Sequence, residues 1–217
     1  MVFLQVADGI TKTVAIPGTD LVHNSTTAGI GKHRFVAFGG ASGNAQNGAN
    51  RLLLTTSIDE GRSWTTPRAL SDELSSPPQS IKLRLGGAGV LDLVWIQTLL
   101  KGNSALRHIR SSDYGATWSE ENDLPISSNV SSFDAVVDGC GNVHVILENV
   151  QPVDDVSLTH AVWRGSWSAV KSVFPDYAFG DPALARRPDG SVALAVNGRA
   201  RKAGTGALVQ THYAELR

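Results

Sequence analysis

Two octets of this chain place the same chemical groups at the same spacing. The first is Ser57-x-Asp59-x-Gly61-x-Ser63-Trp64, and the second carries Ser111, Asp113, Gly115, Thr117 and Trp118 at the matching positions. An aspartate followed by glycine and a hydroxyl predicts a tight turn whose carboxylate accepts hydrogen bonds from the backbone N–H groups that follow. The terminal tryptophan predicts an aromatic plug against the sheet, and stacking on a sugar ring is the alternative use of that ring.

No side chains are spaced for a metal ion or a cofactor. The six histidines include no i,i+2 or i,i+4 pair, which favours packed or hydrogen-bonded imidazoles over metal ligands. The single cysteine, Cys140, excludes an internal disulfide and a thiolate cluster. The glycine-rich stretch 39–48 lacks the Gly-Lys-Ser/Thr ending of a phosphate loop. We therefore expect neither cofactor nor metal.

Composition excludes several classes of partner. Of 217 residues, 19 are Lys or Arg and 20 are Asp or Glu, so a net charge of −1 disfavours nucleic acid and anionic membranes. The most apolar stretch, 90–100, is too short to span a bilayer and contains Asp92 and Gln97. Residues 1–8 lack the positive start and apolar region of a signal peptide, so we expect either a cytoplasmic protein or a chain that begins after a removed leader.

Short apolar runs bounded by turn residues recur along the chain and predict an all-β fold. Each of four segments has a glycine turn before a strongly apolar strand, and the last turn glycines are Gly31, Gly89, Gly141 and Gly190. Their spacings of 58, 52 and 49 residues are typical of propeller blades. The octet aspartates are 54 residues apart, which is one repeat. We predict one domain over residues 1–217, with units at about 20–70, 71–126, 127–175 and 176–217.

The octets resemble the Asp box, or bacterial neuraminidase repeat, of sialidase-like β-propellers. A third copy around Gly165 and Trp167 keeps Gly-Ser-Trp and has lost the aspartate. The resemblance covers residues 20–213 and implies a β-propeller. The repeat spacing gives about four blades of four antiparallel strands, whereas the family enzymes carry six, so the ring is either small or incomplete. The resemblance also implies that both octets stabilise the fold on the face away from the active site, and that the protein is secreted or at the cell surface.

The same resemblance implies an incomplete active site. A sialidase needs three arginines for the sugar carboxylate, a tyrosine nucleophile paired with a glutamate, and an aspartate acid/base. The family's Arg-Ile-Pro signature is absent, and the nearest string, Thr13-Val-Ala-Ile-Pro17, contains no arginine. Of three tyrosines, Tyr114 lies inside an octet. If the chain is an enzyme, the family implies a glycoside hydrolase of exo-sialidase type.

In the topology that the resemblance implies, ligands bind where first strands begin and second strands end. We expect four polar residues to converge there and to bind a sugar or polyol: Asp134, Glu148, Asp181 and Arg199. The alternative is that these side chains cap strand ends or meet solvent.

These observations leave three functional hypotheses. The first is a carbohydrate-recognising, partial or catalytically incomplete glycoside-hydrolase-type propeller, and the second is a non-catalytic propeller that binds a glycan, a glycoconjugate or a protein. The third is a homo-oligomer that completes its ring through open blade edges, because unpaired strand edges invite pairing with a second chain.

Overall fold

The computed structural model describes residues 2–7, 10–16, 22–42, 49–99, 104–126, 129–151, 155–175, 177–200 and 210–216. All regular secondary structure in these ranges is β-strand, which confirms the all-β prediction. Nowhere in these ranges is there a helix with the length and apolar character needed to cross a membrane.

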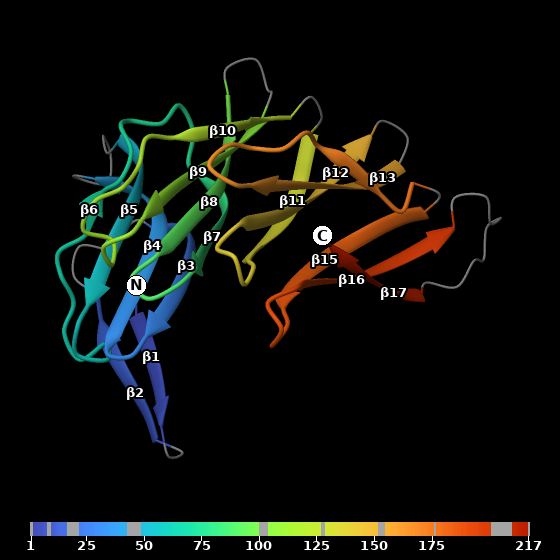
Figure 1. The fold of residues 1–217 in the computed structure, drawn as a ribbon. Coiled ribbons are helices and arrows are strands. Elements are labelled where there is room, and N and C mark those ends of the chain that lie inside the picture. Colours follow the sequence, from blue (N-terminus) through green and yellow to red (C-terminus); the bar gives the residue numbers. More distant parts are fainter. Residues whose placement is uncertain are drawn as a thin grey trace. The chain divides into compact units, whose positions relative to one another are not determined.

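The strands form four antiparallel sheets and a separate hairpin (Figure 1). The hairpin consists of β1 (Val2–Ala7) and β2 (Ile10–Ala15). Sheet 1 contains β3 (Val22–Ile30), β4 (His33–Ser42), β5 (Ala49–Ser57) and β6 (Arg68–Ala69). Sheet 2 contains β7 (Gln79–Leu85), β8 (Leu91–Thr98), β9 (Ser104–Ser111) and β10 (Asn122–Pro125). Sheet 3 contains β11 (Asn129–Val137), β12 (Val143–Gln151), β13 (Asp155–Trp163) and β14 (Lys171–Val173). Sheet 4 contains β15 (Tyr177–Arg186), β16 (Val192–Ala200) and β17 (Gln210–Leu216).

The four sheets follow one another along the chain. They span residues 22–69, 79–125, 129–173 and 177–216. Sheets 1 to 3 have the predicted four strands, whereas sheet 4 has three among the described residues. In every sheet the strands are ordered as they follow one another in the chain, which is the arrangement of a propeller blade.

The first and second strands of each sheet are joined by a hairpin in which glycine is required. In sheets 2, 3 and 4 the fourth residue of the five-residue loop is Gly89, Gly141 or Gly190, with φ between 81° and 89°. Only glycine adopts this backbone conformation without steric cost. The turn of sheet 1 has two residues and begins at Gly31, whose φ is 55°. The glycines that mark the repeat in the sequence therefore close equivalent hairpins.

Contacts divide the chain into two compact units. Unit 1 comprises residues 1–100 and 109–119, and unit 2 comprises residues 101–108 and 120–217.

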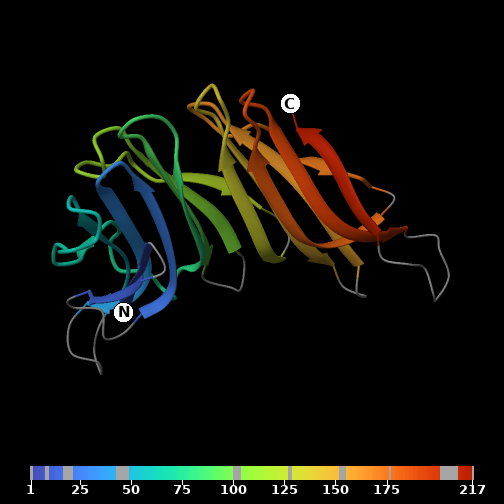
Figure 2. The ribbon, with the colours of Figure 1, turned by 90° about the horizontal axis from the view of Figure 1, so that it is seen from below.

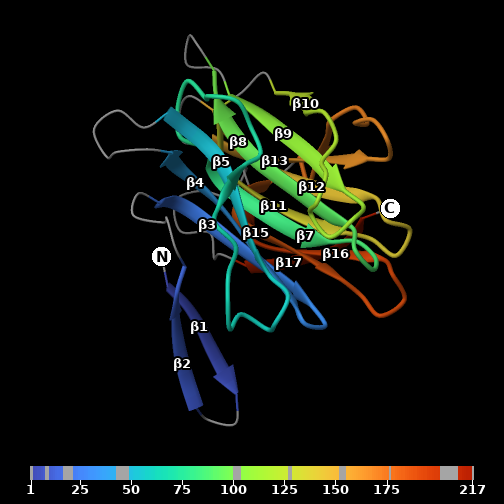
Figure 3. The ribbon, with the colours of Figure 1, turned by 90° about the vertical axis from the view of Figure 1, so that its left-hand side faces the viewer.

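In unit 1, sheet 1 packs on sheet 2 through a largely aliphatic core. Leu91, Leu93 and Trp95 alternate along β8 and lie on one face of that strand, where they join Phe35 and Leu54. The first strands of the two sheets are linked directly, because the backbone N–H of Leu83 on β7 donates to Oγ1 of Thr26 on β3 at 3.1 Å. Figure 3 shows the β1–β2 hairpin extending away from β3, β4 and β5.

In unit 2, the strands of sheet 4 pack on sheet 3 (Figure 2). Ile146 and Leu158 of sheet 3 and Leu194 and Val196 of sheet 4 form the buried core. Because these residues are buried and apolar, a ligand site in unit 2 has to use the polar residues at the two ends of the sheets.

Candidate functional site

Each first strand carries a β-bulge near its N-terminal end. The shift in register falls at residues 23–25 in β3, 79–82 in β7, 130–132 in β11 and 180–183 in β15. Asn24 and Ser80 lie within two of these bulges with φ of 45° and 47°, in a region that non-glycine residues seldom adopt. Bulges re-aim side chains and often lie beside binding sites, so within each unit the bulged strand ends are candidate binding positions.

The bulged end of unit 1 is lined by amides and hydroxyls. Nδ2 of Asn24 donates to the carbonyl of Pro78 at 3.4 Å. Gln97, at the end of β8, is 1% exposed, and its Nε2 donates to the carbonyl and the Oγ of Ser76 and to the carbonyl of Thr98. Its Oε1 has no hydrogen-bond partner among the described residues, which is uncommon for a buried acceptor.

The bulged end of unit 2 carries a carboxylate held by two hydroxyls. Glu148 is half-buried near the end of β12, and its Oε1 accepts a hydrogen bond from Oγ of Ser131 at 2.7 Å. Its Oε2 accepts one from Oγ of Ser132 at 3.3 Å. Gly180 of β15 lies next to this carboxylate: a Cβ built on its backbone would be 4.0 Å from Oε2. Glycine has no Cβ, so no side chain fills the space there. A fixed carboxylate of this kind is a hydrogen-bond acceptor for hydroxyl groups.

Asp134 lies on the same face of sheet 3 as Glu148, two residue pairs further along the ladder. Its Oδ1 accepts from the backbone N–H of Ala135 at 2.9 Å, and its Oδ2 accepts from the N–H of Leu184 at 2.8 Å. The carboxylate therefore links β11 to β15, as Thr26 links β3 to β7.

Asp181 and Arg199 complete the set that the sequence predicts as a ligand site. Asp181 lies within the bulge of β15, and Arg199 pairs with Ala178 at the end of β16. The side chains of both residues lie outside the part of the chain that the structure describes. The four-residue cluster stays a prediction, to which the structure adds Ser131, Ser132 and Gly180. Sequence reasoning missed these three because a bulge leaves no mark in residue types.

The octets have the hydrogen bonds that their residue types predict. In the first octet, Asp59 accepts from the backbone N–H of Ser63 at 2.9 Å and from its Oγ at 2.6 Å. The buried Oγ of Ser57 accepts from the N–H of Gly61 at 2.8 Å and donates to Asp59 at 2.7 Å. Nε1 of Trp64 donates to the carbonyl of Gly61. These bonds close the turn and engage both oxygens of the aspartate.

The second octet repeats this network. Thr117 donates its N–H and its Oγ1 to Asp113, and Nε1 of Trp118 donates to the carbonyl of Gly115. The hydroxyl and backbone hydrogen bonds of Ser63 hold the pKa of Asp59 far below its usual value, and those of Thr117 lower the pKa of Asp113 to about 2. The third copy closes differently: Trp163 and Trp167 form an isolated β-bridge, and Gly165 has a φ of 90°.

In the described ranges, no three His, Cys, Asp or Glu residues are grouped so that they could hold a metal ion. The histidines, which appear dispersed in the sequence, include one close pair: Nδ1 of His144 and Nε2 of His160 are 3.1 Å apart.

Comparisons with known proteins agree with the architecture. No protein-family model and no curated protein sequence matches the chain. A Dyadobacter fermentans protein of unknown function superposes with a TM-score of 0.65 at 17% identity, over 100% of this chain and 71% of that one. A Penicillium chrysogenum α-L-arabinanase, solved with arabinobiose, has a TM-score of 0.57 at 14% identity, over 92% of this chain and 65% of the enzyme. The Trypanosoma rangeli sialidase, solved with the inhibitor DANA, has a TM-score of 0.57 at 11% identity, over 97% of this chain and 40% of the enzyme.

This chain thus spans about two thirds of the arabinanase and less than half of the sialidase. At these identities the likeness establishes the fold alone. The chain has the all-β, four-sheet propeller fold that is also found within a sialidase and an arabinanase.

Proposed function

We propose that this chain recognises carbohydrate at the bulged ends of its first strands and does not hydrolyse it unaided. The observation that carries the proposal is the carboxylate of Glu148, held by Ser131 and Ser132 opposite the bare backbone of Gly180. Sugars present many hydroxyl donors, and a positioned carboxylate binds such donors more strongly than a neutral acceptor does. The fold supports the proposal because a sialidase and an arabinanase share it.

The proposal includes the family assignment. We assign the two octets as Asp boxes of a sialidase-like propeller and residues 1–217 as one propeller domain. Asp59 and Asp113 then have structural roles, which agrees with the turn hydrogen bonds that occupy both carboxylates.

The proposed absence of turnover rests on the missing arginine signature and on the positions of Tyr114 and Tyr213. Tyr114 lies in the second octet, 41% exposed and stacked on His33 at a centroid distance of 4.5 Å. Tyr213 lies on β17, 57% exposed and beneath the guanidinium of Arg187. Neither position is at a bulged strand end, where a residue that attacks a bound sugar would lie. The third tyrosine, Tyr177, begins β15 at such an end, and its side chain lies outside the part of the chain that the structure describes. The Arg-Ile-Pro signature is absent from the sequence.

A glycan array, followed by calorimetry with the best-bound oligosaccharide, tests the proposal. Glu148→Gln keeps the shape of the side chain but removes its charge, so we expect at least about tenfold weaker binding. Glu121→Gln is the matched control, because it makes the same change in a partly exposed carboxylate that pairs with Arg107. Equal affinity of Glu148→Gln and the parent chain would overturn the assignment of the site. Hydrolysis of a fluorogenic sialoside or arabinoside by the parent chain would overturn the non-catalytic part.

Self-association is a second candidate, favoured by sheet 4. No described strand pairs with the outer edge of β17, whereas sheets 1 to 3 each have a fourth strand. An unpaired edge strand is a template for pairing with another chain. Light scattering across the micromolar range should then show a dimer or a larger oligomer, which Thr211→Lys on β17 should weaken. A monomer at every concentration would refute this candidate.

A further inference from the structure

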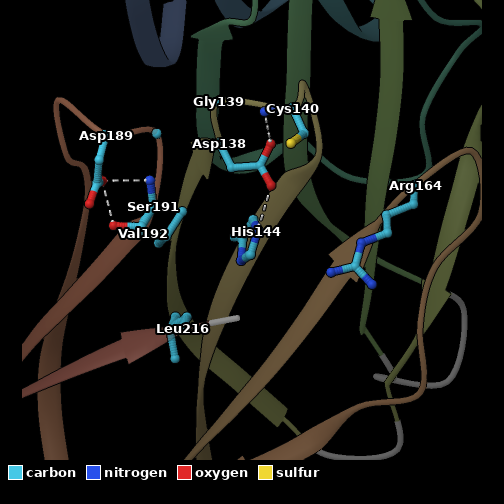
Figure 4. Close-up of a pocket in the computed structure, with 10 residues that line it drawn as sticks. Asp138, Gly139, Cys140, His144, Arg164, Asp189, Ser191, Val192 and Leu216 are labelled. Carbon is cyan, nitrogen blue, oxygen red and sulfur yellow. Dashed lines mark hydrogen bonds and ion pairs between the residues drawn. The ribbon is translucent and has the colours of Figure 1, made fainter.

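A second site lies at the opposite end of sheets 3 and 4 from Glu148. It is a pocket of about 420 Å³ bounded by the β11–β12 and β15–β16 hairpin turns (Figure 4). His144, near the start of β12, forms part of its lining, whereas Glu148 is near the end of that strand. Val192 and Leu216 give the pocket an apolar wall. Its volume is in the range of pockets that hold small organic ligands.

The two hairpin turns hold the pocket in a fixed shape. The backbone N–H of Gly139 donates to the carbonyl of Gly190 at 2.8 Å. A Cβ built at Gly139 would lie 2.8 Å from the Cα of Gly190, so any side chain there would separate the turns. The pocket is therefore formed before a ligand arrives, which reduces the entropic cost of binding.

Both carboxylates of the pocket are engaged within their own turns. Asp138 accepts hydrogen bonds from the N–H of Cys140 and from the N–H and Nδ2 of Asn142, each at 2.8 Å. Asp189 accepts from the N–H and the Oγ of Ser191. Neither carboxylate pairs with the guanidinium in the lining.

That guanidinium belongs to Arg164, which follows β13. It makes no hydrogen bond or ion pair within the described part of the chain, and Figure 4 shows it beside the pocket without an interaction to the other lining residues. Its planar array of donors matches a carboxylate in a bidentate arrangement. The lining thus combines an apolar wall with a cation that lacks a counter-ion.

A chain of hydrogen bonds leads from the pocket into the sheet. Nε2 of His144 is 3.2 Å from Oδ2 of Asp138, and Nδ1 of His144 is 3.1 Å from Nε2 of His160. Burial lowers the pKa of both imidazoles, so both are neutral at pH 7, and the positive charge of Arg164 lowers each pKa further. An anion at Arg164 would offset that charge and favour protonation of the pair.

The charged and titratable groups around the imidazole pair come from several elements. They are Asp138 and Cys140 in the β11–β12 turn, Arg164 after β13, Lys171 on β14 and Asp189 in the β15–β16 turn. Among these, Arg164 is the cation that both lines the pocket and acts on both imidazoles.

We propose that this pocket binds the carboxylate of a small organic acid through Arg164, and that the His144–His160 pair takes up a proton when the acid binds. The ligand needs a carboxylate for Arg164 and a small remaining part that fits against Val192 and Leu216. A sugar acid and a non-sugar acid both carry that chemistry. The proposal is independent of glycan binding at Glu148.

Calorimetry with glucuronate, benzoate, glucose and inorganic phosphate tests the anion site. We expect glucuronate and benzoate to bind and glucose not to bind. The tighter-binding acid of the two shows whether the pocket prefers a sugar acid or a non-sugar acid. Arg164→Gln should weaken binding about tenfold or more. Arg186→Gln is the control, since Arg186 is exposed and does not line the pocket. Unchanged binding in Arg164→Gln, or no binding of either glucuronate or benzoate, would overturn the proposal. Tighter binding of phosphate than of both acids would also overturn it, because it would indicate a general anion site.

Repeating the titration near pH 6 in two buffers of different ionisation enthalpy measures the linked proton. Affinity should rise toward low pH by up to about tenfold per pH unit while the ligand stays ionised. His160→Gln keeps a donor for Nδ1 of His144 but removes one titrating ring, so binding should persist at pH 7 with fewer protons taken up. Binding that depends on Arg164 without proton uptake would refute the linkage. Glu148→Gln should leave both results unchanged, which separates this site from the glycan site.

Discussion

Oδ2 of Asp134 on β11 accepts a hydrogen bond from the backbone N–H of Leu184 on β15 at 2.8 Å. This bond joins the first strands of sheets 3 and 4, and the bond from Leu83 to Thr26 joins those of sheets 1 and 2. The same link between first strands therefore occurs in both units, with a carboxylate in one and a hydroxyl in the other.

Asp134→Ala should destabilise unit 2. It leaves the N–H groups of Ala135 and Leu184 without their acceptor in a half-buried place, and we expect a loss of about 1–3 kcal/mol in the free energy of unfolding. Urea denaturation followed by tryptophan fluorescence measures it. Asp134→Asn retains an acceptor oxygen and should lose less. Equal loss for Asp134→Ala and Asp134→Asn would argue against the role of the acceptor.

Ser57→Ala and Ser111→Ala should have matching effects on the two octets. Each removes a buried hydroxyl that accepts from a glycine N–H and orients the aspartate. We expect each to cost about 1–2 kcal/mol in thermal or urea unfolding. Ser112→Ala is the control, because that serine is exposed and occupies a variable position of the second octet. A loss in Ser112→Ala as large as in Ser111→Ala would contradict the prediction.

Arg110→Met should be among the most destabilising single changes in unit 1. Asp92 is fully buried, and Arg110 donates to its two oxygens at 2.7 and 3.0 Å. Removing the guanidinium takes two charge-assisted hydrogen bonds from a buried carboxylate, at a cost of about 3–5 kcal/mol. Arg62→Met provides the comparison, since the Arg62–Glu60 pair is exposed and should contribute less than about 1 kcal/mol. Similar unfolding midpoints for the two variants would refute this reasoning.

Unfolding free energy should fall as the pH drops from about 6.5 toward 4. Burial lowers the pKa of His160 from 6.5 to about 4, so the unfolded chain binds a proton that the folded chain does not. The stability that the neutral ring provides is complete above pH 6.5 and is lost toward pH 4, by an amount on the order of 2–3 kcal/mol. Urea titrations at pH 7 and pH 5 measure the difference. It should shrink in His160→Gln and persist in His33→Gln. If the difference in unfolding free energy between pH 7 and pH 5 is as large in His160→Gln as in the parent chain, other titrating groups cause it.

The octet turns and the four sheets could be predicted from sequence because both depend on local chemistry. Gly89 and Asp59 specify their turns through their own backbone and side-chain preferences. The pairing of His144 with His160 depends on strand register, which places residues 16 apart in sequence side by side across β12 and β13. Asp134 was predicted to face a ligand, and its bond to Leu184 depends on the packing of two sheets. Such contacts leave no signal in the spacing of residues along the chain.

The hydrogen-bonded aspartates of the octets have a consequence for the order in which the chain comes apart in acid. Asp113 stays ionised down to about pH 2, and Asp59 to lower values still, so the corners of sheets 1 and 2 keep their internal hydrogen bonds. The imidazole of His160 in sheet 3, with a pKa of about 4, takes up its proton well before that point. Progressive acidification should thus yield an intermediate in which unit 1 retains its protected amides while those of unit 2 exchange freely.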